Sequence, residues 1–249
     1  MKNEKRTNKV VIIAAGTSSR IIEKTNDTPK TLLPFGNGSI LSTILKNFNN
    51  SGISDFIIVV GYKSGLIKDY LKKNNNFGLN ISFILNEEWL RGNGISVLLS
   101  EEATKGENFI LSMSDHIVSE SAIKRLIEYD SDYNLLLVDK RVNEIFDIDD
   151  ATKVNLNDNQ IINIGKEIPV YNGIDCGVFR LKNNFYDAMR QQLKDDKESI
   201  SAAIQILIEN QDMHAVFTEK EDYWLDIDTP QAYKYGLEKM TDKQPEITL

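Results

Sequence analysis

Short apolar runs alternate with amphipathic segments through the first 140 residues of the chain. Continuous aliphatic runs occupy residues 10–15, 56–60, 109–113 and 135–138, and a weaker run occupies residues 81–85. Runs of this length without polar alternation are typical of strands buried on both faces. Between them, apolar residues recur at helical spacing over residues 40–48, 64–71 and 119–127. This alternation predicts an α/β fold with a Rossmann-like, mostly parallel sheet flanked by helices.

The pattern changes after residue 140. Residues 152–156, 161–164 and 177–181 have the composition of short strands, with little helix between them. We therefore expect a small antiparallel insertion over about residues 141–181, which would form a lid on the sheet. An amphipathic helix follows at 200–208, and Thr229-Pro230 supplies the N-cap and first residue of a last helix. No repeat or linker divides the sequence, so we expect a single domain over residues 1–249.

Composition excludes several classes of protein. The formal net charge of −8, from 29 basic and 37 acidic residues, argues against a nucleic-acid partner, because such proteins usually present a basic face. The N-terminus lacks the apolar stretch of a signal peptide, and no segment reaches the roughly 20 apolar residues of a membrane span. We expect a soluble, cytoplasmic protein. Its one cysteine, Cys176, lies in an apolar run and is expected to be a buried small residue.

A candidate phosphate-binding loop follows the first predicted strand, where ligands bind in open parallel sheets. A glycine-rich turn lets backbone N–H groups approach phosphate oxygens, and an arginine can grip a polyphosphate with two parallel hydrogen bonds. Ten residues further, Pro29 would place a second cation, Lys30. The alternative is an ordinary strand-to-helix turn with surface cations. The loop comprises Ala14, Ala15, Gly16, Thr17, Ser18, Ser19 and Arg20.

Three carboxylates are candidates for a metal site. Asp115 follows an apolar strand, and Asp226 and Asp228 are two residues apart, which puts both on one face if the segment is a strand. Carboxylates converging on one crevice suit a hard cation such as Mg²⁺. Alternatively, one of the later two caps the helix that begins at Pro230. His116 could orient Asp115 or contact a substrate phosphate, and a structural loop histidine is an equal alternative.

Taken together, these motifs resemble the nucleotidyltransferases that activate sugar and polyol phosphates. Later segments are similar to a narrower branch, the CTP-dependent inositol-1-phosphate cytidylyltransferases. The similarity extends from about Lys9 to Met240, and relatives that act on phosphonates or phosphocholine share much of it. The chain departs from the pattern at Thr17, Ser18 and Cys176. The segments are 91–96 (RGNGIS), 113–117 (MSDHI), 138–141 (VDKR), 150–154 (DATKV), 164–166 (IGK), 175–177 (DCG) and 224–230 (WLDIDTP).

The resemblance implies a GT-A-like nucleotidyltransferase fold and a Mg²⁺-dependent reaction. CMP would pass from CTP to a small phosphate or phosphonate acceptor, with inositol 1-phosphate as the leading candidate and pyrophosphate as the leaving group. Arg20 would hold the β- and γ-phosphates, Lys30 would neutralise charge at the α-phosphate, and Asp115 and Asp228, with Asp226 third, would hold the metal. No general base is needed, because a phosphate monoester with a second pKa of about 6 is already a dianion at neutral pH.

Two further sets of residues are expected to bind the substrates. Gly92, Asn93, Gly94 and Ser96 would contact the base, with Asn86 adding a base or ribose contact; the alternative is a helix start with an asparagine cap. The acceptor would lie between the sheet and the insertion, where Trp89 and Tyr171 could also line the pocket. The acceptor-binding candidates, each of which could instead be a surface charge, are His116, Lys140, Lys153, Lys166 and Asp175.

Other functions remain open from the sequence alone. A glycosyltransferase would share the sheet and the carboxylates but would not need Arg20 and Lys30 to hold a triphosphate. A sugar-1-phosphate nucleotidyltransferase would differ in its acceptor, and a non-catalytic nucleotide-binding regulator would need fewer of these residues. Within the cytidylyltransferase interpretation, 2-aminoethylphosphonate, 2-hydroxyethylphosphonate and phosphocholine are alternative acceptors. The expected partners are small-molecule substrates, with no nucleic acid or membrane, and a homodimer is left open.

Overall fold

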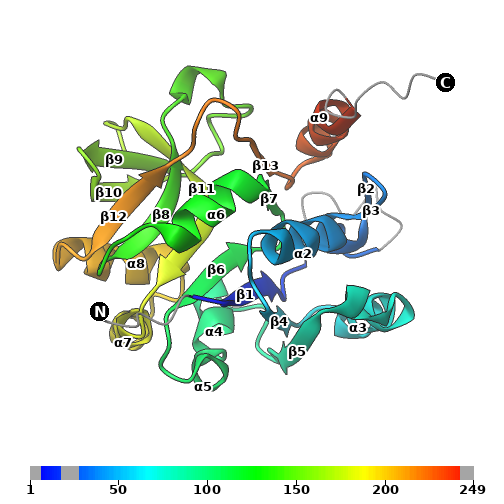
Figure 1. Cartoon of the computed structure of the whole chain (residues 1–249). Helices are drawn as coiled ribbons and strands as arrows, with labels where there is room; N and C mark the ends of the chain where they lie inside the picture. Colours follow the sequence, from blue (N-terminus) through cyan, green and yellow to red (C-terminus); the bar gives the residue numbers. More distant parts are fainter. Residues whose placement is uncertain (1–6, 18–27, 242–249) are drawn as a thin grey trace.

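A computed structural model describes residues 7–17 and 28–241 of the chain. Within this part a nine-stranded sheet has the order β5-β4-β1-β6-β11-β8-β12-β10-β9, with helices on both faces (Figure 1). The strands are β1 (Lys9–Ala14), β4 (Asp55–Val60), β5 (Asn80–Leu85), β6 (Phe109–Met113), β8 (Asn134–Asp139), β9 (Lys153–Asn157), β10 (Gln160–Gly165), β11 (Gly173–Leu181) and β12 (Met213–Phe217).

The sheet is mixed, so the expectation of a mostly parallel sheet holds for one half of it. β5, β4, β1 and β6 are parallel neighbours, and β12 is parallel to β8. β11 runs antiparallel to both β6 and β8, and β10 runs antiparallel to β12 and β9. β9, β10 and β11 follow each other through short turns without a crossover helix, and such connections join antiparallel strands.

Helices cover both faces because the strands bury residues on both sides. Alternate β1 residues enter different cores: Val10 and Ile12 pack with the helices α2, α3 and α6, whereas Val11 and Ile13 pack with α4, α7 and α8. The helices are α2 (Ile40–Asn50), α3 (Ser64–Lys73), α4 (Asn93–Leu98), α5 (Glu101–Thr104), α6 (Glu120–Glu128), α7 (Asn184–Leu193), α8 (Ile200–Glu209) and α9 (Pro230–Thr241), with short 3₁₀ turns at Lys30–Leu32, Asn75–Gly78 and Val142–Glu144.

Two small antiparallel pairs connect the sheet to the C-terminal segment. β7 (His116–Val118) pairs with β13 (Trp224–Asp226), which places Asp226 opposite His116. β2 (Pro34–Phe35) pairs with β3 (Gly38–Ser39), and the Tyr233 hydroxyl of α9 donates a hydrogen bond to the Pro34 carbonyl at 2.5 Å. These pairings bring residues that are about 100 to 200 positions apart to one edge of the main sheet.

The predicted strands and helices are present, and the structure adds elements that the pattern did not reveal. α5, α7 and β12 were not predicted. β11 begins at Gly173 rather than at residue 177, and it lies in the centre of the sheet between β6 and β8. Cys176 is fully buried, as expected. In the described part of the chain, no helix has the length and apolar character that a membrane crossing requires.

Candidate active site

Two cavities meet beyond the carboxyl ends of β1 and β6. The smaller, of about 250 Å³, lies between the end of β1 and residues 29–31. The larger, of about 900 Å³, is bounded by β11, β13, α9 and the loop that follows β8. Within the described ranges, four residues line both cavities, namely Asn93, Met113, Asp115 and Asp228. Ligands in the two cavities would therefore approach each other beside two carboxylates.

A buried ion pair lies at this junction. Lys30 Nζ is 2.7 Å from Asp115 Oδ2, and the Lys30 side chain is only 8% exposed. Pro29 and the following 3₁₀ turn direct Lys30 inwards, while Asp115 lies two residues beyond the end of β6. Burial opposes ionisation of Asp115, but the Lys30 ammonium and a hydrogen bond with His116 hold the pKa of this carboxyl well below its ordinary value. Asp115 is therefore ionised at neutral pH.

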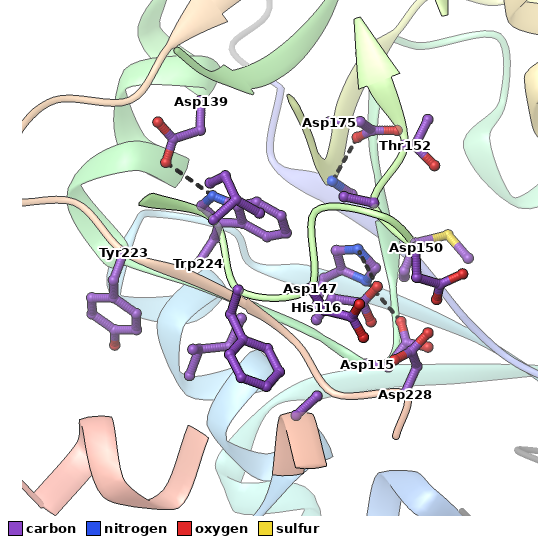
Figure 2. Close-up of a pocket in the computed structure, with 18 of the residues that line it drawn as sticks. Asp115, His116, Asp139, Asp147, Asp150, Thr152, Asp175, Tyr223, Trp224 and Asp228 are labelled. Atoms are coloured by element: carbon purple, nitrogen blue, oxygen red, sulfur yellow. Dashed lines mark hydrogen bonds and ion pairs between the residues drawn. The ribbon is translucent and has the colours of Figure 1, made fainter. Parts of the chain in front are cut away.

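His116 joins two of the candidate metal carboxylates. Its Nδ1 lies 2.8 Å from Asp115 Oδ1, and its Nε2 lies 3.7 Å from Asp226 Oδ2 (Figure 2). The Trp224 ring is parallel to the imidazole, with 6.2 Å between centroids and 8° between planes. Burial lowers the pKa of His116, but Asp226 and Asp115 outweigh it and raise the pKa to about 9. These contacts support the interpretation that His116 orients Asp115.

Asp175 lies beside this group on an irregular part of β11. The register of β11 against β8 shifts between Asp175 and Phe179, and Gly177 within the shift has a φ of +74°. This is a glycine-containing β-bulge, which redirects side chains. Gly177 N donates to Asp175 Oδ1 at 2.7 Å. Burial raises the pKa of Asp175 to about 6, although the Gly177 hydrogen bond and His116 oppose the shift.

The donor set fits a hard divalent cation. One ligand atom from each of Asp115, His116 and Asp226 lies within 4.8 Å of the others, and Asp228 is 7% exposed and lines both cavities. Figure 2 shows Asp228 beside Asp115. His116 Nδ1 is already engaged with Asp115, so the imidazole suits a supporting position behind the carboxylates. The carboxylate oxygens of the predicted trio are the chemically suitable ligands for Mg²⁺.

The predicted acceptor residues fall into two groups. His116, Lys166 and Asp175 line the larger cavity, and Lys166 Nζ is 2.5 Å from Asp150 Oδ1. Lys140 and Lys153 line neither cavity. Because side chains alternate along a strand, Asp139 at the end of β8 faces the larger cavity, and Lys140 lies instead over the Phe217 ring, 3.8 Å from its centroid.

Lys153 has a structural environment. It is 9% exposed, and its Nζ donates to the carbonyl oxygens of Asp149, Ala151 and Lys166 at 2.9–3.3 Å. A lysine that satisfies three backbone carbonyls has no N–H left for a ligand. Lys153 therefore stabilises the loop between β8 and β9, which forms one wall of the larger cavity.

A polar network beside the larger cavity was not predicted. Arg141 donates through Nε and Nη2 to both oxygens of Asp139, at 3.0 and 2.8 Å, and Trp224 Nε1 donates to Asp139 at 3.0 Å. Arg141 also donates to the carbonyls of Lys220 and Asp222. The network fixes Trp224, which in turn stacks on His116 (Figure 2). The sequence Asp139-Lys140-Arg141 could have revealed this network, because side chains alternate along an extended chain and those of Asp139 and Arg141 therefore point to the same side.

The predicted base-binding segment is held by a distant loop. Gly92 N donates to Glu198 Oε2 at 3.0 Å, and Gly94 N donates to the Glu198 carbonyl at 2.8 Å. A Cβ at Gly92 would collide with Glu198, and one at Gly94 would collide with Met189. These glycines therefore permit close packing against the 198 segment.

The other predicted base contacts have mixed positions. Asn86 Nδ2 donates to Ser96 Oγ at 2.9 Å, and both residues are buried away from the cavities. Asn93 reaches both cavities. The two aromatic residues expected near the acceptor, Trp89 and Tyr171, line neither cavity. Trp89 packs instead on Tyr62, which does line the smaller cavity.

The first part of the predicted phosphate loop borders the smaller cavity. Ala14, Gly16 and Thr17 line it, together with Lys30. Ala15 is buried, and its carbonyl oxygen accepts a hydrogen bond from the backbone N–H of Tyr62 at 2.9 Å. The remaining residues of that prediction, Ser18, Ser19 and Arg20, lie outside the described residues.

Fold and site together define a class, the α/β proteins with a ligand site beyond the carboxyl ends of parallel strands. Comparison with known families makes the assignment specific. A family model described as "Nucleotidyl transferase" matches residues 9–243, and the chain belongs to this family. It is therefore an enzyme of nucleotide transfer.

Individual relatives add detail. The chain is 31% identical over 223 residues to a "Bifunctional IPC transferase and DIPP synthase" of Aquifex aeolicus, covering 89% of the chain and 49% of the relative. It is 29% identical over 243 residues to a "Bifunctional protein GlmU" of Methanococcus maripaludis, covering 94% and 55%. The chain thus spans about half the length of these relatives. It also resembles the solved inositol-1-phosphate CTP transferase from T. maritima, with a TM-score of 0.79, 26% identity and coverage of 97% and 99%.

Replacing Gly177 with alanine should destabilise the protein more than the same change at Gly106. Both glycines have positive φ, +74° and +71°, where alanine costs roughly 1–2 kcal/mol. At Gly106 an added Cβ would have only Asn183 Oδ1 nearby, at 4.0 Å, whereas at Gly177 it would collide with the His116 ring. Urea unfolding of both variants measures the difference. Equal losses of unfolding free energy would show that His116 is not held by this contact.

Proposed function

We propose that the chain transfers CMP from CTP to inositol 1-phosphate and releases pyrophosphate. The observation behind the proposal is the junction of two cavities at Asp115 and Asp228, beside the buried ammonium of Lys30. The smaller cavity borders the loop after β1 and would take the nucleotide, and the larger would take the acceptor. The similarity to inositol-1-phosphate CTP transferase supports the choice of both substrates.

The reaction requires two polyanions to approach each other. An oxygen of the acceptor phosphate attacks the α-phosphorus of CTP, a new P–O bond forms, and the bond from the α-phosphorus to the bridging oxygen breaks as pyrophosphate leaves. Lys30 lies where it would neutralise charge on the transferred group. Asp115 keeps Lys30 in place, and His116 keeps Asp115 in place. Positioning and electrostatic stabilisation supply most of the catalysis in such reactions.

Asp115, Asp228 and Asp226 would hold Mg²⁺, which when bound supplies positive charge to the phosphate oxygens and assists the leaving group. On the acceptor side, Lys166 lies at the wall of the larger cavity, where its ammonium could bind the acceptor phosphate. Asp175 lines the same cavity and could accept a hydroxyl hydrogen bond. The part of the loop between β8 and β9 that follows Arg141 would cover the acceptor.

A second group of acceptors is favoured by the carboxylates of the larger cavity. Glu144, Asp147 and Asp150 of the loop after β8 line it, close to the rings of Phe146 and Trp224. Carboxylates accept hydrogen bonds from hydroxyl groups, as inositol would supply, but aromatic rings and carboxylates also bind ammonium groups. 2-Aminoethylphosphonate and phosphocholine are therefore the second candidates.

Pyrophosphate release with Mg²⁺ tests the proposal directly. Four nucleoside triphosphates would be crossed with inositol 1-phosphate, phosphocholine, glucose 1-phosphate, 2-aminoethylphosphonate and 2-hydroxyethylphosphonate. We expect release with CTP and inositol 1-phosphate at a rate well above every other pair. Release with CTP and an ammonium-bearing acceptor instead would replace the acceptor in the proposal, and release with another triphosphate would refute the choice of CTP.

The Asp228→Asn variant should fold normally and lose turnover. Asparagine keeps the shape of Asp228 but removes a negative charge at the junction of the cavities, so metal-assisted transfer should fall at least about 100-fold, the scale for losing one group that stabilises transition-state charge. The measurement is kcat across a Mg²⁺ titration. As a control, Asp212→Asn alters a carboxylate paired with Lys182 that lines neither cavity. Near-normal turnover of Asp228→Asn would remove Asp228 from the metal site.

Two lysines from the predicted acceptor set should behave differently. Lys166→Ala should raise KM for inositol 1-phosphate by about tenfold or more, the scale of one charge-assisted hydrogen bond, with little change in KM for CTP. Lys140→Ala should leave both constants near wild type, because Lys140 lies over Phe217 outside the cavities. Steady-state kinetics with each substrate varied in turn give the two KM values for each variant. An unchanged acceptor KM in Lys166→Ala would exclude Lys166 from the site.

A further inference from the structure

The orientation of the Asn93 amide is fixed by a backbone donor. Its Oδ1 accepts a hydrogen bond from the N–H of Ile200, the first residue of α8, at 2.9 Å. A backbone N–H can only donate, so the atom facing it must be the amide oxygen. The Nδ2 group, with two N–H donors, is therefore turned away from α8. Among the described residues it has no hydrogen-bonding partner.

Asn93 lies where the two cavities join. It is exposed, and it lines the smaller and the larger cavity together with Met113, Asp115 and Asp228. Of these four residues, two are carboxylates, which accept hydrogen bonds, and one is apolar. Asn93 is the member of the set that can donate a side-chain hydrogen bond at neutral pH.

The segment that carries Asn93 is held firmly on both sides. Before it, Arg91 donates to Glu198 Oε1 through Nε at 2.8 Å, and Gly92 N donates to Glu198 Oε2. After it, Gly94 N donates to the Glu198 carbonyl. The glycines at 92 and 94 allow this approach. The Asn93 amide is thus preorganised, which is the condition under which a donor stabilises a developing charge most effectively.

We propose that Asn93 is a further catalytic residue, whose Nδ2 donates a hydrogen bond to a non-bridging oxygen of the α-phosphate as CMP is transferred. This role rests on the proposed function, because the α-phosphate is the group that must lie at the junction when one ligand occupies each cavity. Phosphate oxygens are acceptors only, and the carboxylates around them cannot donate. Asn93 loses no proton in the step: a P–O bond to the acceptor forms, the bond to the pyrophosphate oxygen breaks, and the amide hydrogen bond shortens.

The role differs from the base contact that the sequence predicted for Asn93. A residue that reads the base changes the preference among nucleoside triphosphates and the KM for CTP. A residue that donates to the α-phosphate chiefly changes kcat, because the charge on the oxygen develops in the transition state. The two roles can therefore be separated by kinetics.

The Asn93→Asp variant tests the proposal without disturbing the fold. An aspartate oxygen accepts the Ile200 hydrogen bond equally well, and a negative charge at the N-terminus of α8 is favourable. The variant should therefore unfold at the same temperature as the wild type or a higher one. It removes both donors and places a negative charge beside the phosphate, so kcat with CTP and inositol 1-phosphate should fall about 100-fold or more, with a much smaller change in KM for CTP.

A matched control comes from β10. Asn163 Oδ1 also accepts a backbone hydrogen bond, from Ile164 N at 2.9 Å, and Asn163 lines neither cavity. Asn163→Asp makes the same chemical change and should leave kcat unchanged. A kcat of Asn93→Asp within about threefold of wild type would overturn the proposal, as would an altered triphosphate preference with kcat intact. If the wild type releases no pyrophosphate with any pair, the proposed function itself fails and this role fails with it.

Discussion

The ion pair between Lys30 and Asp115 is the interaction on which the site depends. It joins residues that are 85 positions apart, at 2.7 Å, in a region where the lysine side chain is almost fully buried. Burying two charges is costly unless each is paired and further hydrogen bonds satisfy the remaining lone pairs. The second oxygen of Asp115 is engaged by His116. The pair therefore requires β6, β7 and the 3₁₀ turn after Pro29 to be placed together, and this placement creates the wall between the two cavities.

His116 extends this constraint to the larger cavity. It lies among Asp115, Asp226 and Asp175, and its raised pKa of about 9 means that it partly neutralises their charge at neutral pH. The His116 ring packs against Gly177, where an added Cβ would collide with it. The Trp224 ring lies parallel to the imidazole, and the indole N–H of Trp224 donates a hydrogen bond to Asp139. Residues from β11 and β13, together with Asp115, thus surround one imidazole, and Asp139 of β8 holds Trp224.

The sequence predicted the parts of this site that follow from local order. Apolar runs located the strands, and Asp115, Lys30 and the first loop residues were chosen as candidates because they come just after a strand or a rigid proline; the structure brings them to the smaller cavity. Parts that depend on tertiary contacts were missed. Lys140 was chosen over Asp139 and Arg141 because the register of β8 was unknown. The glycines at 92 and 94 suggested an approach to a base, whereas their packing partner, Glu198, is more than 100 residues away. The central position of β11 could not be inferred from a run of β-prone residues alone.

The position of β11 explains how this sheet brings two cavities together. β6 is the last strand of the parallel half, so Asp115 follows its carboxyl end. β11 is antiparallel to β6, with Val178 opposite Ser112, so the amino end of β11 lies at the same edge and carries Asp175 beside the residues that follow β6. A parallel strand in this place would present its carboxyl end there and would need a crossover helix to return. The antiparallel strand instead enters from the short connection after β10, which begins at Lys166 on the wall of the larger cavity. The change of strand direction between β6 and β11 therefore sets the smaller and the larger cavity on either side of one pair of carboxylates.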